Sequence, residues 1–250
     1  MTSDPASSSI DLRPDIAEGH SNAWRHIARP GAWWSSAERI AIAHASRNAW
    51  DCQVSRDRKA ALSPAHVQGE ILRTEADSVL SEDVVDTVYR LVTDPARLTR
   101  GWLEELIDRG ALTHASYVEL IGVVTQALSM DVLRLALGQP LDEIPEPETG
   151  EPSHYEPPGL AMEEAWVPMI KRQNLGPEEQ DLYGKTGNVI RALSAVPEEV
   201  RALKRLSSHH YLSIEAMSDF VGGESVGRSI DRAQMELVAG RVSALHECFY

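Results

Sequence analysis

Hydrophobic residues recur every three to four positions in several stretches of the chain, which is the spacing of one face of an α-helix. After Ser81-Glu82-Asp83, the apolar positions are Val84, Val85, Val88, Leu91 and Val92. Asp94-Pro95 follows them directly, and proline cannot continue a helix. This stretch therefore predicts an amphipathic helix that begins at Ser81 and ends before Pro95.

A longer apolar stretch begins at Thr113 and ends at Gly138. Its apolar residues fill most faces of the predicted helix, so we expect this helix to be central and buried. Glu119 interrupts the apolar pattern. A carboxylate in such a place is either buried and paired or part of an interface.

Further helices are indicated by the residues that begin and end them. Ser35 and Glu38 have the spacing of a capping box and predict a helix that runs toward Cys52. Pro197 precedes two glutamates and predicts another helix start. Asp231 and Gln234 predict the start of the last helix. The core face expected for that helix consists of Met235, Leu237, Val238, Val242 and Leu245.

Alternation of apolar and polar residues, which is typical of strands, is scarce, and the sequence contains only two phenylalanines. The expected fold class is therefore all-α. Residues 139–168 contain seven prolines and cannot form a helix. A disordered linker is one interpretation of this segment. Its apolar residues, among them Ile144, Trp166 and Ile170, favour an irregular strap that packs on the helices.

These boundaries divide the chain into four predicted parts. Residues 1–30, which are broken by prolines, are expected to form an extended N-terminal arm. Residues 31–138 form a first helical unit, residues 139–176 the proline-rich connecting strap, and residues 177–250 a second helical unit.

Composition and charge exclude several classes of function. The 250 residues include 24 basic and 38 acidic ones, for a net charge of −14, which argues against binding to nucleic acid or to an anionic membrane surface. Two cysteines can form neither a disulfide framework nor a four-cysteine zinc site. His209 and His210 are adjacent and point to different helix faces, so we interpret them as surface or interface histidines. We predict no metal and no cofactor, and we expect a cytoplasmic protein because no apolar leader or membrane span is recognisable.

The last eighteen residues, from Ala233 to Tyr250, place Glu236 twelve residues before Cys248. This segment resembles the alkylhydroperoxidase AhpD / carboxymuconolactone decarboxylase-like family, in which a glutamate precedes the first cysteine of a C-x-x-C pair by that distance. The segment from Ala37 to Ser55 resembles the same family more distantly. The resemblance covers most of residues 31–250 and implies a tandem of two AhpD-like helical units.

The activity that the resemblance implies is a thiol-dependent peroxidase. Cys248 would be the first redox cysteine, Glu236 a base or relay, and His246 a neighbouring member of the catalytic set. Cys52, Glu38 and Ser55 would form a vestigial second site. The implied partners are a peroxide or another small-molecule substrate and a thiol reductant protein, and a homo-oligomer is expected.

Two departures from the family pattern make this redox centre incomplete. Ser55 occupies the second cysteine position of the first half, and the sequence ends at Tyr250, one residue before the second cysteine position of the other half. A selenocysteine codon read as a stop, a natural truncation or an engineered end would each give this terminus. Two alternatives therefore stay open: a non-catalytic helical scaffold, and a carboxymuconolactone decarboxylase-like enzyme that uses no cysteine pair.

Overall fold

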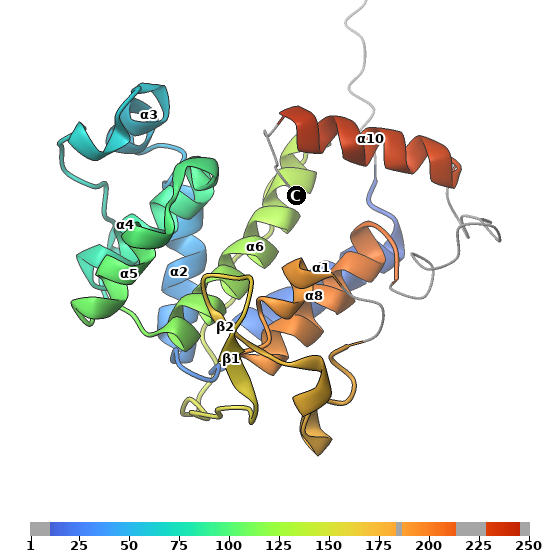
Figure 1. Cartoon of the computed structure of the whole chain (residues 1–250). Coiled ribbons are helices and arrows are strands. Elements are labelled where there is room, and N and C mark those ends of the chain that lie inside the picture. The colour runs from blue at the N-terminus through green and yellow to red at the C-terminus, as the bar shows by residue number, and fades with distance from the viewer. Residues whose placement is uncertain (1–10, 184–186, 214–228, 246–250) are drawn as a thin grey trace, which may run out of the picture.

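The computed structural model describes residues 11–183, 187–213 and 229–245, which are mostly helical (Figure 1). The helices are α1 (Pro14–Ile27), α2 (Ser36–Asn48), α3 (Gln53–Ala60), α4 (Glu82–Thr93), α5 (Arg100–Asp108), α6 (His114–Ala136), α7 (Asn188–Arg191), α8 (Pro197–His210) and α10 (Arg232–Leu245). Short 3-10 turns lie at Pro64–His66, Glu75–Asp77, Pro95–Arg97, Arg172–Asn174 and Pro177–Glu179. Strands β1 (Leu160–Met162) and β2 (Pro168–Ile170) form an antiparallel pair. The predicted all-α class is confirmed.

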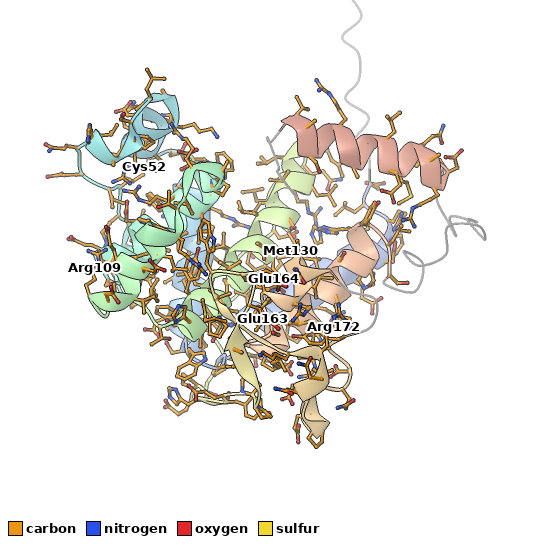
Figure 2. All side chains as sticks on the ribbon, viewed as in Figure 1. Cys52, Arg109, Met130, Glu163, Glu164 and Arg172 are labelled. Atoms are coloured by element: carbon orange, nitrogen blue, oxygen red, sulfur yellow. The ribbon has the colours of Figure 1, made fainter. Side chains whose placement is uncertain are left out.

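The core is built around α6. Helices α2 and α4 pack on one part of it, and α1 and α8 pack on each other and on the rest of it. Met130 of α6 is completely buried and lies in the middle of the molecule (Figure 2). Helix α8, from the second half of the sequence, therefore shares one hydrophobic core with helices of the first half. The division into tandem AhpD-like units stays a prediction.

The helix starts predicted from capping residues are confirmed. Ser35 and Glu38 form the expected capping box on α2, and Ser81 caps α4 by accepting from the N–H of Val84. Pro197 is the first residue of α8. Asp231 and Gln234 exchange hydrogen bonds of 2.9 and 2.8 Å between the side chain of each and the backbone N–H of the other.

The prediction of an extended arm over residues 1–30 was wrong for residues 14–27, which form α1, while residues 1–10 lie outside the described part of the chain. Pro14 is the first residue of this helix, where the missing N–H of proline costs no hydrogen bond. The buried stripe of α1 consists of Gly19, His20, Ala23, Trp24 and Ile27. These residues have helical spacing, but two of them are a glycine and a histidine. The hydrophobic pattern that would indicate a helix is therefore weak in the sequence.

The proline-rich strap is irregular and packed, as predicted, apart from the short strand pair. Its backbone bonds to the connection between α1 and α2: the N–H of Glu148 donates to the carbonyl of Ala28 at 2.8 Å, and that of His154 to the carbonyl of Ala32 at 2.8 Å. Val167 and Ile170 are buried in the core. The strap therefore braces the α1–α2 connection instead of crossing open solvent.

The predicted core face of the last helix was wrong. Of the five residues expected there, only Met235 is buried, while Leu237 and Leu245 are 75% and 63% exposed. Met235, Val238, Val242 and Leu245 share one face of α10 by their spacing, but no described element packs extensively against this helix, so most of that face stays exposed. The central position of α6 is confirmed, although Val132 and Leu135 near its end are exposed. Among the described residues, no helix combines the length and the apolar character needed to cross a membrane.

Candidate functional site

The connection between α2 and α3 places Cys52 at the start of a helix. Helix α2 ends at Asn48, and Cys52 is the N-cap of α3 with extended backbone angles, φ −73° and ψ 119°. The first N–H groups of a helix have no partner inside it, and the helix dipole adds positive potential at this end. The sulfur of Cys52 therefore lies where a negative charge is stabilised.

The surroundings of Cys52 favour its thiolate. Burial disfavours the charged form, since the residue is only 1% exposed. Hydrogen bonds from the backbones of Leu72, Ser55 and Val54 and from the Ser55 hydroxyl oppose that effect and hold the pKa of Cys52 below its ordinary value. Within the part of the chain that the structure describes, the thiol of Cys52 is free.

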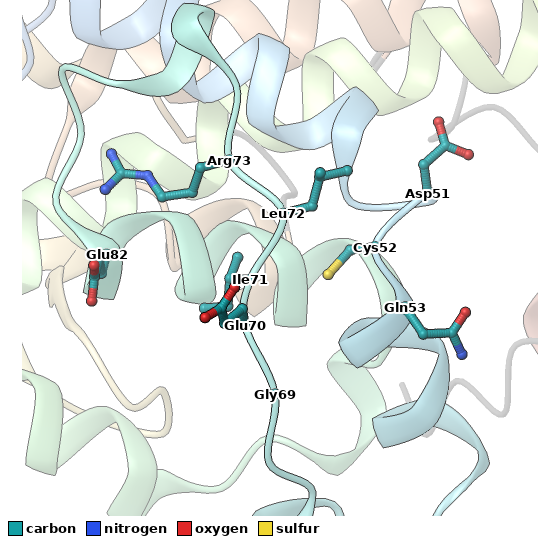
Figure 3. A pocket seen from close by; sticks show the side chains of 9 residues that line it. All are labelled: Asp51, Cys52, Gln53, Gly69, Glu70, Ile71, Leu72, Arg73 and Glu82. Atoms are coloured by element: carbon teal, nitrogen blue, oxygen red, sulfur yellow. The ribbon is translucent and has the colours of Figure 1, made fainter.

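A cavity of about 860 Å³ adjoins Cys52 (Figure 3). On one side it is lined by residues 51–53 at the start of α3, and on the other by residues 69–73 of the loop that leads to α4. The sulfur of Cys52 points toward this loop in Figure 3. A small molecule in the cavity would lie beside Cys52, which its neighbours cover almost completely.

The charged groups of this cavity are mostly acidic. Among the described residues that line it, Asp51, Glu70 and Glu82 are acidic and Arg73 alone is basic. The guanidinium of Arg73 is engaged elsewhere, because its Nη2 donates to the carbonyls of Leu80 at 2.6 Å and Asp77 at 3.3 Å. The cavity therefore offers little to an anionic ligand.

Tyr89 of α4 fixes the loop that faces Cys52. The Tyr89 hydroxyl donates to the carbonyl of Leu72, and Leu72 is also the residue whose backbone hydrogen-bonds to Cys52. Tyr89 is completely buried, and burial raises its pKa, so its phenol remains a donor. One peptide segment thus links the tyrosine to the thiol.

Of the predicted vestigial set, the structure brings together Cys52 and Ser55 but not Glu38. Ser55 lies on the first turn of α3, next to Cys52, and helps to lower the pKa of that thiol. The carboxylate of Glu38 accepts from the N–H and the hydroxyl of Ser35 at 2.9 and 2.7 Å, at the opposite end of α2. Glu38 is a capping residue, and its predicted place in a site with Cys52 was wrong.

Of the predicted catalytic set, only Glu236 falls within the described part of the chain. Cys248 and His246 lie outside it. Glu236 is exposed on α10, its carboxylate accepts from Arg232 at 2.6 Å, and hydrogen bonds from Tyr211 and Arg232 lower its pKa. Helix α10 lies far from α3 in Figure 1, so Glu236 does not belong to the Cys52 cavity.

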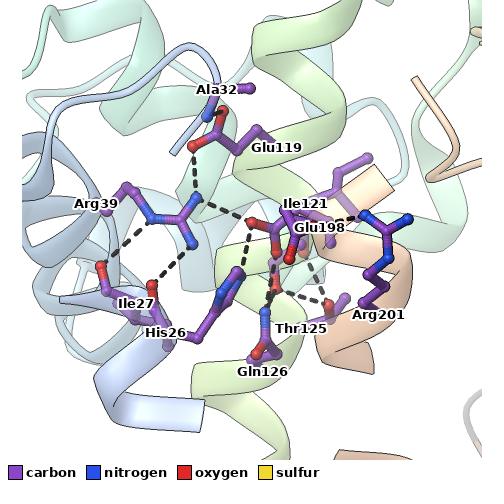
Figure 4. Close-up of polar contacts among 12 residues, drawn as sticks. His26, Ile27, Ala32, Arg39, Glu119, Ile121, Thr125, Gln126, Glu198 and Arg201 are labelled. Carbon is purple, nitrogen blue, oxygen red and sulfur yellow. Dashed lines mark hydrogen bonds and ion pairs between the residues drawn. The ribbon is translucent and has the colours of Figure 1, made fainter. Parts of the chain in front are cut away.

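A second polar group lies in the core, where Arg39 bridges two carboxylates (Figure 4). Its Nη1 donates to Oε1 of Glu119 at 2.5 Å and to Oε1 of Glu199 at 2.9 Å, and all three side chains are at most 1% exposed. Oε2 of Glu119 also accepts from the N–H groups of Ala32 and Trp33. The expectation that Glu119 is either buried and paired or interfacial is thus settled in favour of burial and pairing.

The two carboxylates of this group have opposite pKa shifts. Burial raises the pKa of Glu119, because Arg39 only partly offsets it and the nearby charge of Glu199 adds to it. Glu199 is also buried, but Arg39 and His26 outweigh the burial and lower its pKa to about 2. Glu199 is therefore the fixed anion that pairs with Arg39.

Two further side chains extend this group toward α1 and α6. Nε2 of His26 lies 3.0 Å from Oε1 of Glu199, and Nε2 of Gln126 donates to Oε2 of Glu199 at 3.0 Å.

Sequence reasoning missed Arg39, Glu199 and His26. The available signal was Arg39 itself, a charge directly before the apolar run of α2, but its partners lie 80 and 160 residues away.

Comparisons with known proteins add no relative: no protein-family model, no curated protein and no solved structure matches the chain.

Proposed function

We propose that this protein is a thiol-dependent oxidoreductase of the peroxidase type and that Cys52 is a reactive thiol in it. The observation that carries the proposal is the position of Cys52, at the N-terminus of α3 and on the wall of a cavity of about 860 Å³. A lowered thiol pKa at a helix start is what peroxide chemistry requires, since the thiolate is the nucleophile. Cys52 thereby gains a larger role than the vestigial one that the sequence predicts.

The proposed reaction consumes one peroxide and two thiols. The Cys52 thiolate attacks one peroxide oxygen, the O–O bond breaks, and the leaving alkoxide takes a proton to become an alcohol or water. A reductant thiol condenses with the resulting sulfenic acid, which forms a mixed disulfide and releases water. A second thiol then releases the small disulfide and regenerates Cys52. The two thiols supply both electrons and both protons.

The same proposal includes the AhpD-like tandem and the roles of Cys248, His246 and Glu236 in the second half. The arrangement of the first half supports it: α2 ends, three residues follow, and a cysteine opens the next helix. A helix break of this kind is what Glu236 and Cys248 need, because an unbroken helix would separate them by roughly 18 Å.

The charges of the cavity limit the substrate and the partner. The cavity is lined by three carboxylates, and its arginine, Arg73, already donates to a backbone carbonyl. An uncharged peroxide is therefore favoured over an anionic one. The reductant would be a small thiol or a thiol protein. A free, low-pKa thiol persists in a reducing compartment, so we place the protein in the cytoplasm. The exposed apolar residues of α10 are compatible with a homo-oligomer.

A non-catalytic helical scaffold is the second candidate, and three observations favour it. Cys52 is 1% exposed, and the position one helical turn later is a serine and not a second thiol. The buried Arg39 group joins α1, α2, α6 and α8, as expected of a chain whose task is to hold helices together.

Peroxide consumption in the presence of a small thiol separates these candidates. We would compare the wild-type chain with Cys52→Ser and Cys248→Ser, and trap sulfenic acid with dimedone for mass spectrometry. The proposal expects dimedone on Cys52 and the loss of most consumption in Cys52→Ser. Equal consumption by the wild type and Cys52→Ser would remove Cys52 from the mechanism. No consumption by the folded, reduced wild-type chain would favour the scaffold.

A further inference from the structure

A cavity with mostly apolar walls lies between α6, the connection from β1 to β2, and residues 189–193 around α7. Figure 2 labels Glu163 and Glu164 in this connection. The cavity has a volume of about 360 Å³, which is within the range of small-molecule sites. We call it the α7 cavity. It shares no lining residue with the Cys52 cavity, so the two would hold different molecules.

The border of the α7 cavity leaves large apolar side chains in water. Trp166 and Val189 line it and are 41% and 53% exposed. Val118 and Leu193, which also line it, belong to the hydrophobic core and are 1% and 6% exposed. An apolar group in the cavity would remove water from the exposed side chains, which is favourable.

Two aromatic side chains, Trp166 and Tyr117, line the cavity from different elements. The faces of such rings carry negative potential and attract organic cations. The ring of Tyr117 is held by an edge contact with Trp102, with the ring centroids 6.4 Å apart. Burial raises the pKa of Tyr117 to about 12, so this phenol is uncharged at neutral pH.

Glu164 is the one charged residue among the described residues that line the cavity. It is exposed and makes no ion pair with any described residue, whereas Glu163 beside it pairs with Arg191. Arg100 also contacts this connection, but its Nε lies 3.8 Å from a carboxylate oxygen of Glu104. Both arginines thus have a carboxylate of their own, and the charge of Glu164 is left without a counterion.

These features select the charge of a ligand. An anion would be repelled by the carboxylate of Glu164 and by the faces of the two rings. An uncharged apolar molecule would gain the apolar contacts alone. A cation with an apolar body gains these contacts and both attractions. Because Glu164 is exposed, the cationic group can stay partly hydrated, which avoids most of the cost of burying a charge.

We propose that the α7 cavity is a binding site for an organic ammonium ion with a hydrophobic body, with the apolar part against Val118 and Leu193 and the ammonium group beside Glu164 and Trp166. The site does not depend on the proposed peroxidase activity.

Benzylamine and benzyl alcohol form a matched pair of probes, because they share the ring and only the amine is charged at pH 7.5. Phenylacetate carries the same ring with an anionic group. Each would be titrated into ¹⁵N-labelled full-length protein while the indole N–H of Trp166 is followed by NMR and assigned by its absence in Trp166→Leu. We expect a saturable shift with benzylamine, binding of benzyl alcohol that is about three- to thirtyfold weaker, and no saturable shift with phenylacetate.

Three variants decide where the probe binds and whether its charge matters. Glu164→Gln keeps the shape of the side chain and should weaken benzylamine binding about two- to fivefold, while benzyl alcohol binding stays unchanged. Glu151→Gln makes the same change at an exposed position of the strap and should bind like the wild type. Ala192→Leu narrows the cavity and should abolish the binding of both probes.

Three results would overturn the proposal. They are benzyl alcohol binding as tight as that of benzylamine, a saturable phenylacetate response of similar affinity, and benzylamine binding that is the same in Glu164→Gln as in the wild type. The last result does not depend on how well Ala192→Leu folds, because Glu164 is an exposed residue.

Discussion

Ser55 lies one helical turn after Cys52, and its hydroxyl is one of the groups that lower the pKa of the Cys52 thiol. Under the proposed AhpD-like relationship, this serine occupies the position of the second cysteine. In this protein the position stabilises a thiolate but cannot resolve a sulfenic acid. The geometry of a dithiol site is thus present with only one sulfur.

Ser55→Cys should convert this position into a dithiol site. Residues at the N-cap and the first turn of a helix are within the Cα distance that a disulfide requires, up to about 7 Å. Mild peroxide should therefore form a disulfide between Cys52 and the new cysteine at position 55. Intact-mass spectrometry would show the loss of two hydrogen atoms, and a peptide map would identify the linked residues. Asp57→Cys, further along α3, is the control and should form no such bond. A variant Ser55→Cys that stays a dithiol after oxidation would contradict the geometry.

Tyr89→Phe should slow the reaction of Cys52. Without the phenol donor, the Leu72 segment loses the bond that holds its backbone toward the sulfur, and the pKa of Cys52 should rise. We expect the alkylation rate at neutral pH to fall by about threefold to tenfold, the effect of one hydrogen bond. Tyr117→Phe removes a hydroxyl from another buried tyrosine and should leave the rate unchanged. Equal rates in the wild type and Tyr89→Phe would rule out this positioning role.

Arg39→Met should destabilise the fold strongly. The variant leaves Glu119 and Glu199 buried without their common cation, and breaking a buried ion pair in this way costs about 3–5 kcal/mol. Arg29→Met provides the contrast, because the Arg29–Glu148 pair is 58% and 47% exposed and contributes about 0–1 kcal/mol. Urea unfolding followed by circular dichroism measures both values. Equal losses in the two variants would contradict the role given to the buried group.

Acid should destabilise the protein through His210. Nε2 of His210 lies 2.8 Å from Nε2 of His20, and burial and the neighbouring histidines lower the pKa of His210 to about 4. The unfolded chain, with a histidine pKa near 6.5, binds this proton more readily. Stability contributed by neutral His210 is therefore complete above about pH 6.5 and is lost as the pH falls toward 4. After allowance for partial exposure, we expect a loss of about 1–2 kcal/mol.

Unfolding free energies at several pH values, compared between the wild type and His210→Gln, isolate this contribution. Asp142, Asp131 and Arg134 act on His20, and His209 acts on His210, but these groups are common to both proteins. The profile of His210→Gln should be flatter between pH 6.5 and 4. Replacement of the exposed His66 by glutamine should leave the pH dependence of the unfolding free energy as it is in the wild type. Parallel profiles for the wild type and His210→Gln would show that His210 does not carry the effect.

Local signals in the sequence were sufficient for most helices. Capping residues such as Ser35, Ser81 and Thr113 determine where α2, α4 and α6 begin, because each accepts from an N–H three residues later. Helix α1 was missed because prolines suggested an extended arm and its buried stripe contains Gly19 and His20. Burial of these residues depends on α8, whose residues lie far away in the sequence.

The candidate site could be predicted only in part. The sequence indicates Cys52 and Ser55 as site residues. The other wall of the cavity is formed by residues 69–73, about twenty positions later in the chain, and no local sequence pattern shows that Leu72 faces the thiol. Glu38 was placed with Cys52 because of the resemblance, although its capping spacing already assigns it to Ser35. Arg39 and its partners depend on tertiary packing alone.

The pH dependence of Cys52 alkylation shows whether the folded protein stabilises the thiolate of this residue. Iodoacetamide labelling is followed at Cys52 by mass spectrometry, in the folded wild type, in Ser55→Ala and in the urea-unfolded chain. We expect the labelling midpoint of folded Cys52 to lie at a lower pH than that of the same cysteine in the unfolded chain, and the midpoint in Ser55→Ala to move back toward the unfolded value. A folded midpoint at or above the unfolded one would contradict the claim that this protein holds a reactive thiolate at Cys52.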